Sequence, residues 1–132
     1  MTSSTPRSPA HTPTFLDRLR SLFGGEPSDG SLGATVKAAR ALELVAGGAT
    51  LLDVRESGEW RTGHAPRAVH LPLGQVEQGA RRLPHGRPVV VVCASGMRSR
   101  TAAKQLRSLG YDAASLSGGM PAWQRAGGEV KR

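Results

Sequence analysis

Cys93 is the residue with the clearest capacity for chemistry, and it is the only cysteine among 132 residues. It ends PVVVVC (88–93), whose four consecutive valines are typical of a central parallel strand covered on both faces. The next residues, Ala-Ser-Gly-Met, form a tight turn in which Gly96 can adopt a positive φ. A strand, a turn and a helix in this order point backbone N–H groups inward as an anion-binding nest. We therefore expect the thiolate of Cys93, its reactive form, to be stabilised there and open to solvent.

Two arginines follow this turn. Arg98 and Arg100 fall in the first turn of the next predicted helix, where positive side chains oppose the helix macrodipole. Such a break of a local rule indicates function, and two guanidiniums beside a ring of amides would hold an anionic sulfur donor. The alternative is that Cys93 is a small buried hydrophobic residue that completes the valine strand. Its place at the carboxyl end of a strand, beside a glycine turn and two arginines, favours the functional interpretation.

Helical and strand patterns alternate around this loop from residue 34 onwards. Apolar runs predict strands at 50–54, 68–72, 88–93 and 113–119. Helices are expected at 38–46, 74–82 and 98–109, with single helical turns near 58–60 and within 120–128. The residues of the helix at 98–109 that should face inward are Ala102, Ala103, Leu106 and Leu109. Strands that alternate with helices predict an α/β domain with a mainly parallel sheet, in which ligands bind beyond the carboxyl ends of the strands.

The composition limits the class of protein. A chain of 132 residues allows one ordinary domain, and no apolar run approaches the ~20 residues that span a bilayer, so no integral membrane segment is expected. The net charge of +8 is scattered, and the aromatic residues are two Trp, one Tyr and two Phe, which argues against nucleic acid as a partner. One cysteine excludes an internal disulfide. The N-terminal residues lack a secretory signal, which predicts a cytoplasmic protein with a free thiol.

Residues 1–33 are predicted to be a disordered or linker tail, and residues 34–132 the folded domain. Within the tail, residues 14–23 (TFLDRLRSLF) place their apolar side chains on one helical face. This short amphipathic helix either packs against the domain or makes a weak contact with a membrane surface or a partner protein. Its shortness favours the first interpretation, because so short a segment is rarely helical on its own.

Asp53 and Arg55 lie near the same edge of the predicted sheet, at the end of the first predicted strand. Asp53 could accept hydrogen bonds from loop amides or pair with an arginine. We assign it this supporting role because a thiolate nucleophile needs no separate general base. Arg55 could add to the anion site or form an ion pair with Glu56 or Glu59.

The remaining candidates have structural interpretations. His64 and His70 are typical of hydrogen-bonded imidazoles within a fold, and Trp60 and Trp123 of core aromatics that pack short helices onto the sheet. The histidines show no metal-ligand spacing, so neither a metal nor another cofactor is expected.

Three segments in order along the chain together resemble a rhodanese-like domain: LLDVRESGEWRTGHAPRAVHLPL (51–73), CASGMRS (93–99) and GGMPAW (118–123). The resemblance implies an α/β fold with a five-stranded, mostly parallel sheet flanked by helices on both faces. It also implies a nucleophilic Cys93 that carries sulfane sulfur as a persulfide, and an Arg98 that faces the substrate. The persulfide would be cradled by the loop residues Ala94, Ser95, Gly96, Met97, Arg98 and Ser99.

The spacing within the loop separates two classes of enzyme. Cysteine-dependent phosphatases need an arginine six positions after the nucleophile, and that position is Ser99 here, so a sulfurtransferase is favoured. Thiosulfate-specialised members of the family that the sequence resembles commonly carry a cation two positions after the cysteine, here Ser95, and another near Glu59. This departure argues against thiosulfate as the physiological donor, while the reaction with thiosulfate in vitro is still expected.

The sequence thus predicts a thiosulfate-type sulfurtransferase. Cys93 takes sulfane sulfur from a small anionic donor or a persulfide and passes it to a thiol or protein acceptor in two covalent steps. Because the chain has no second cysteine, the sulfur must leave to another molecule. The alternative is a non-catalytic interaction module on the same fold, anchored by residues 14–23, against which the intact Cys93 loop argues.

Overall fold

The computed structural model describes residues 31–132, and the helix predicted at 14–23 lies outside the described residues. Five strands form one parallel sheet in the order β1-β5-β4-β2-β3. The valine strand is central, paired with β2 on one side and β5 on the other. The strands are β1 (Thr35–Val36), β2 (Thr50–Asp53), β3 (Val69–His70), β4 (Val89–Val92) and β5 (Ala113–Leu116). The predicted five-stranded parallel sheet is confirmed.

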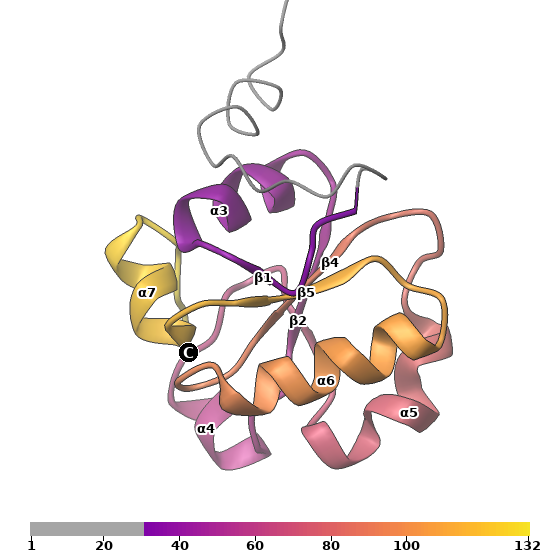
Figure 1. Cartoon of the computed structure of the whole chain (residues 1–132). Coiled ribbons are helices and arrows are strands. Elements are labelled where there is room, and N and C mark those ends of the chain that lie inside the picture. Colours follow the sequence, from indigo (N-terminus) through magenta and orange to yellow (C-terminus); the bar gives the residue numbers. More distant parts are fainter. Residues whose placement is uncertain (1–30) are drawn as a thin grey trace, which may run out of the picture.

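Helices cover both faces of this sheet. One face carries α3 (Ala38–Ala46) and α7 (Gly119–Arg125), which contact each other, and the opposite face carries α5 (Val76–Gly79) and α6 (Met97–Ser108) (Figure 1). α4 (Ser57–Thr62) lies beside the start of α6 (Met97–Ser108). The segment predicted as one helix at 74–82 is a series of short turns: η2 (Leu73–Gln75), α5 (Val76–Gly79) and η3 (Ala80–Arg82).

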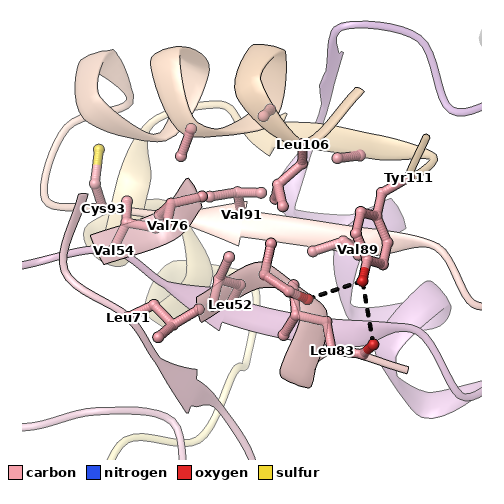
Figure 2. Close-up of a cluster of buried hydrophobic side chains, with 14 residues drawn as sticks. Leu52, Val54, Leu71, Val76, Leu83, Val89, Val91, Cys93, Leu106 and Tyr111 are labelled. Atoms are coloured by element: carbon pink, nitrogen blue, oxygen red, sulfur yellow. Dashed lines mark hydrogen bonds between the residues drawn. The ribbon is translucent and has the colours of Figure 1, made fainter. Parts of the chain in front are cut away.

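Strand β4 is buried on both faces, as its four valines predict. Val91 and Cys93 belong to one cluster of buried apolar side chains, while Val90 and Val92 belong to the cluster on the opposite face. This alternation follows from the two-residue period of a strand. Figure 2 shows the first cluster, in which Cys93 lies at the end nearest the start of α6. The core therefore extends up to the sulfur atom.

The strand boundaries differ from prediction where glycines or short elements intervene. The strand predicted at 113–119 ends at Leu116, because Gly118 (φ 84°) and Gly119 (φ 65°) adopt left-handed conformations that end an extended strand. The strand predicted at 68–72 is reduced to the two residues of β3. β1 was not predicted, since two residues are too few to show a period of two.

One residue of the helix predicted at 98–109 was wrongly assigned to the interior. Ala102, Ala103 and Leu106 are fully buried, but Leu109 is 50% exposed because it lies at the C-cap, beyond the last helical residue. At the other end of the described chain, Leu32 is 6% exposed and packs in the second cluster, although the sequence assigned it to the linker. No helix in residues 31–132 is long and apolar enough to cross a membrane.

Candidate active site

The loop between β4 and α6 is fixed from two sides. Gly96 is the N-cap of α6 and takes a left-handed conformation (φ 113°), which lets the chain turn sharply from strand to helix. From the other side α7 contacts the loop: the Met120 N–H donates to the carbonyl oxygen of Cys93 (2.9 Å). A Cβ atom on Gly119 would clash with the backbone carbonyl group of Ala94. The backbone on both sides of the sulfur is therefore held in place by close packing.

The Sγ atom of Cys93 lies within a ring of hydrogen-bonding groups. The N–H of Gly96 donates to Sγ (3.0 Å), as does the N–H of Ser99 (3.3 Å). Burial raises the pKa of the Cys93 thiol, but hydrogen bonds from the Ser99 hydroxyl and from the amides of Ser99, Gly96 and Ser95 together outweigh it. The net result is a pKa below the ordinary value of 9.0. The loop thus favours the thiolate, as a strand–turn–helix nest should.

A buried pair of hydroxyl groups completes this ring. The thiol of Cys93 donates to Oγ of Ser99 (3.3 Å), and Oγ of Ser99 lies 2.7 Å from Oγ of Ser115 on β5. Ser99 and Ser115 are 0% and 1% exposed. When Cys93 ionises, the Ser99 hydroxyl can turn its proton towards the sulfur while Ser115 donates to Ser99 in return. Sequence reasoning missed Ser115; the available signal was a polar residue inside an otherwise apolar strand.

The expectation of an open thiolate is wrong for this structure. Cys93 is 1% exposed, because the loop covers one side of Sγ and the apolar cluster that contains Val91 packs against the other side. The residue is thus both the hydrophobic end of a strand and the centre of a ring of donors. A reagent must pass the loop to reach the sulfur.

Arg98, the cation expected to face the substrate, forms an ion pair with Glu59 on α4. Its Nη1 lies 2.7 Å from Oε1 and its Nη2 lies 2.9 Å from Oε2, so the guanidinium binds the carboxylate in a bidentate manner. The hydrogen bonds from Arg98 lower the pKa of Glu59 to about 2, and the pair raises the pKa of Arg98. The side chains are 32% and 37% exposed, so the pair lies at the rim of the site.

Asp53 and Arg55 form a buried ion pair at the end of β2. Nη2 of Arg55 lies 2.7 Å from Oδ2 of Asp53 and also donates to the carbonyl oxygen of Gly63 (2.7 Å). Asp53 is 0% exposed and Arg55 6%. Asp53 therefore pairs with an arginine, one of the two roles foreseen for it, whereas Arg55 pairs with neither Glu56 nor Glu59. The pair ties the end of β2 to the chain that follows α4.

The two histidines near α4 enclose Trp60. Its ring stacks on His64 at 3.6 Å and on His70 at 4.5 Å between centroids. Nδ1 of His64 lies 2.8 Å from the carbonyl oxygen of Trp60, and Nε2 of His70 lies 2.8 Å from that of Arg55. Both imidazoles have the hydrogen-bonded structural role predicted. Trp60, however, is half-buried in this stack and outside both core clusters, whereas Trp123 is a core residue at 5% exposure.

The other predicted loop residues line the surface beside the sulfur. Ser95 is exposed, Ala94 is half-buried, and Met97 is 71% exposed at the start of α6. Nε of Arg100 lies 3.4 Å from the carbonyl oxygen of Gly96.

Among residues 31–132 no group of three or more His, Cys, Asp or Glu side chains could hold a metal ion.

Residues 37–126 match the family model of the rhodanese-like domain. The chain belongs to the rhodanese-like family. "Putative sulfurtransferase YtwF" of Bacillus subtilis (strain 168) is 38% identical over 81 residues, which are 61% of this chain and 76% of that protein. "Putative sulfur carrier protein YrkF" of the same organism is 41% identical over 61 residues, 46% of this chain but 33% of that protein. Family and relatives together support a function in sulfur transfer.

Solved structures of rhodanese-like proteins share the fold. A rhodanese-related protein from Thermoplasma volcanium has a TM-score of 0.68 and 28% identity, with 74% of this chain and 97% of that chain covered. A rhodanese homologue from the extremely thermophilic bacterium Thermus thermophilus has a TM-score of 0.56 and 35% identity, with 67% of this chain and 98% of that chain covered. The layered sheet described above is therefore the architecture of the rhodanese-like family.

Proposed function

We propose that this rhodanese-like protein is a sulfurtransferase that works through a persulfide on Cys93. The thiolate attacks the outer, sulfane sulfur of a donor. A bond forms between Sγ and that sulfur while the donor's own bond to it breaks, and the leaving group departs with the bonding electron pair. Thiosulfate releases sulfite in this way, and a thiol persulfide releases its thiolate.

The second step returns the protein to its starting state. A thiophilic acceptor attacks the outer sulfur of the persulfide, and the bond between the two sulfurs breaks, so that Cys93 leaves as a thiolate. Cyanide becomes thiocyanate, and a thiol becomes a persulfide. Because the chain has a single cysteine, the acceptor is a second molecule, either a small thiol or a protein. Cys93 is a free thiol, which suits the reducing cytosol as the place of action.

The observation that carries this proposal is the set of donors that converge on Sγ. The amides of Gly96 and Ser99 donate to Sγ, and the Ser99 hydroxyl, which accepts from the thiol, can donate to the thiolate once its proton turns towards the sulfur. These groups lower the pKa of the thiol despite its burial. The same ring, with the amides of residues 94–99, is suited to hold the terminal sulfur anion of a persulfide. The low exposure of Cys93 requires the donor's sulfur to enter past the loop rim.

Steady-state transfer from donor to cyanide tests the proposal. Thiosulfate, methanethiosulfonate and a thiol persulfide serve as donors, and the two covalent steps predict parallel lines in double-reciprocal plots. Cys93→Ser should lower kcat at least about a thousandfold, because it removes the nucleophile. Ser108→Ala, which changes an exposed hydroxyl on α6, should leave kcat unchanged. Wild-type protein that turns over none of the three donors would contradict the proposal and favour a non-catalytic interaction module.

A further inference from the structure

The most informative feature that the proposed reaction does not itself explain is the partner of Arg98. A free guanidinium near Sγ would attract anionic donors, and Arg98 directly precedes Ser99, whose N–H donates to Sγ (3.3 Å). The charge of the Cys93 thiolate also raises the pKa of Arg98. Yet both of its terminal nitrogens are bonded to the carboxylate of Glu59. The two residues are 39 positions apart in sequence and come from different helices. The pair is therefore a product of the tertiary fold at the mouth of the site.

Glu59 is itself held in position by α4. Its Oε1 accepts a hydrogen bond from the N–H of Glu56 (2.8 Å), as part of a reciprocal capping box at the start of the helix. With its pKa lowered to about 2, its carboxylate is charged throughout the neutral range. A fixed negative charge thus faces the guanidinium at all relevant pH values.

The guanidinium of Arg55, which follows the neighbouring strand β2, is also compensated by a carboxylate. Arg55 is paired with Asp53 at 2.7 Å, and both are buried. Arg100 is exposed and its Nε contacts the carbonyl oxygen of Gly96 (3.4 Å). Of these three guanidiniums, those of Arg55 and Arg98 are thus compensated by carboxylates, and the amides of Gly96 and Ser99 supply hydrogen-bond donors that suit a sulfur atom.

We infer that Glu59 is a specificity-determining residue: by pairing with Arg98 it makes the site favour donors with a single negative charge, such as the anion of a simple thiol persulfide, over the thiosulfate dianion. The inference rests on the proposed function and names its donor class. Glu59 does not touch the reacting atoms. It acts through Arg98 and through its own charge, so its effect must scale with the charge of the reagent that approaches Sγ.

Glu59→Gln is the variant that isolates this charge. Glutamine is also accepted at the third helical position of a capping box, because its side-chain oxygen can still accept the N–H of Glu56. The variant therefore removes the negative charge while it keeps the bond that fixes the helix start. Glu77→Gln, at an exposed position of α5, gives the same change in net charge as a matched control.

Three reagents that differ in charge report the effect on Cys93. They are iodoacetamide (neutral), methanethiosulfonate (one negative charge) and thiosulfate (two negative charges). Each reaction is quenched at set times, and the modified fraction of the protein, read from its intact mass, gives the second-order rate constant. For each donor we take the ratio of its rate constant to that of iodoacetamide. Relative to wild type, Glu59→Gln should increase this ratio about threefold for methanethiosulfonate and about tenfold for thiosulfate. Glu77→Gln should change both ratios by less than about 1.5-fold, because an exposed charge farther away is screened.

The outcomes separate this inference from the proposed function. If both donors form a persulfide but their ratios do not change in Glu59→Gln, or change equally, the inference is wrong and the proposed function stands. An equal change with all three reagents would show a structural role of Glu59 and would also overturn the inference. If iodoacetamide modifies Cys93 while neither donor does, in wild type and variant alike, the proposed function is wrong and the inference falls with it.

Discussion

At Cys93, burial and hydrogen bonding act on the sulfur in opposite directions. Burial among apolar side chains would keep the thiol neutral, as in an ordinary core cysteine. The donors of Gly96 and Ser99 reverse this effect, so that the pKa of the thiol falls below its ordinary value. Ser99 contributes twice, through its amide and its hydroxyl, and Ser115 supports the hydroxyl from β5. Ser99, six positions after Cys93, is thus a neutral donor at the position where a cysteine-dependent phosphatase would need an arginine.

The substitution Ser99→Ala should raise the pKa of Cys93, because it removes the hydroxyl donor while the burial that opposes ionisation remains. The rate of alkylation by iodoacetamide follows the thiolate fraction, so its pH profile should move to higher pH. At neutral pH the rate should fall about tenfold, which is the worth of one hydrogen bond to a charged group. Ser108→Ala should reproduce the wild-type profile, and an unshifted profile in Ser99→Ala would show that the hydroxyl does not stabilise the thiolate.

At the scale of elements, local patterns in the sequence predict those strands and turns that depend only on neighbouring residues. The run of valines predicts a buried β4, and the small residues after it predict the turn into α6. The contact between α4 and α6 was beyond such patterns, because it depends on the sheet order. β2 pairs with β4 in parallel, so the helices that follow the two strands start side by side. For this reason the sequence offered Glu59 only as a possible partner of Arg55 and did not reveal that it pairs with Arg98.

The packing of α7 against the loop leads to a prediction at this scale. Gly119→Ala should lower the free energy of unfolding by about 3 kcal/mol. The new Cβ would clash with the backbone of Ala94 and Cys93, and the φ of +65° at this position is strained for alanine. Gly127→Ala has a positive φ (+103°) but no atom within 4 Å, so it should lose only the strain, about 1 kcal/mol. Urea unfolding of both variants measures the difference. Equal losses would mean that α7 does not restrain the loop.

At the scale of the whole molecule, the parallel sheet brings the residues of the site together at one edge. Asp53, Cys93 and the glycines that follow β5 are distant in sequence, but the carboxyl ends of parallel strands meet at the same edge. The α/β class and this edge could be predicted from the alternation of strands and helices. The burial of Cys93 was only the alternative to an open thiolate, because it depends on how closely the loop and the first core cluster pack around one atom.

Intact mass after a single exposure to a donor tests the central claim most directly. Wild-type protein incubated with methanethiosulfonate should gain the mass of one sulfur atom per chain and lose it again when cyanide is added. Cys93→Ser should gain nothing under the same conditions. A wild-type mass that does not change, or a gain that persists in Cys93→Ser, would contradict the assignment of a sulfur-carrying role to Cys93.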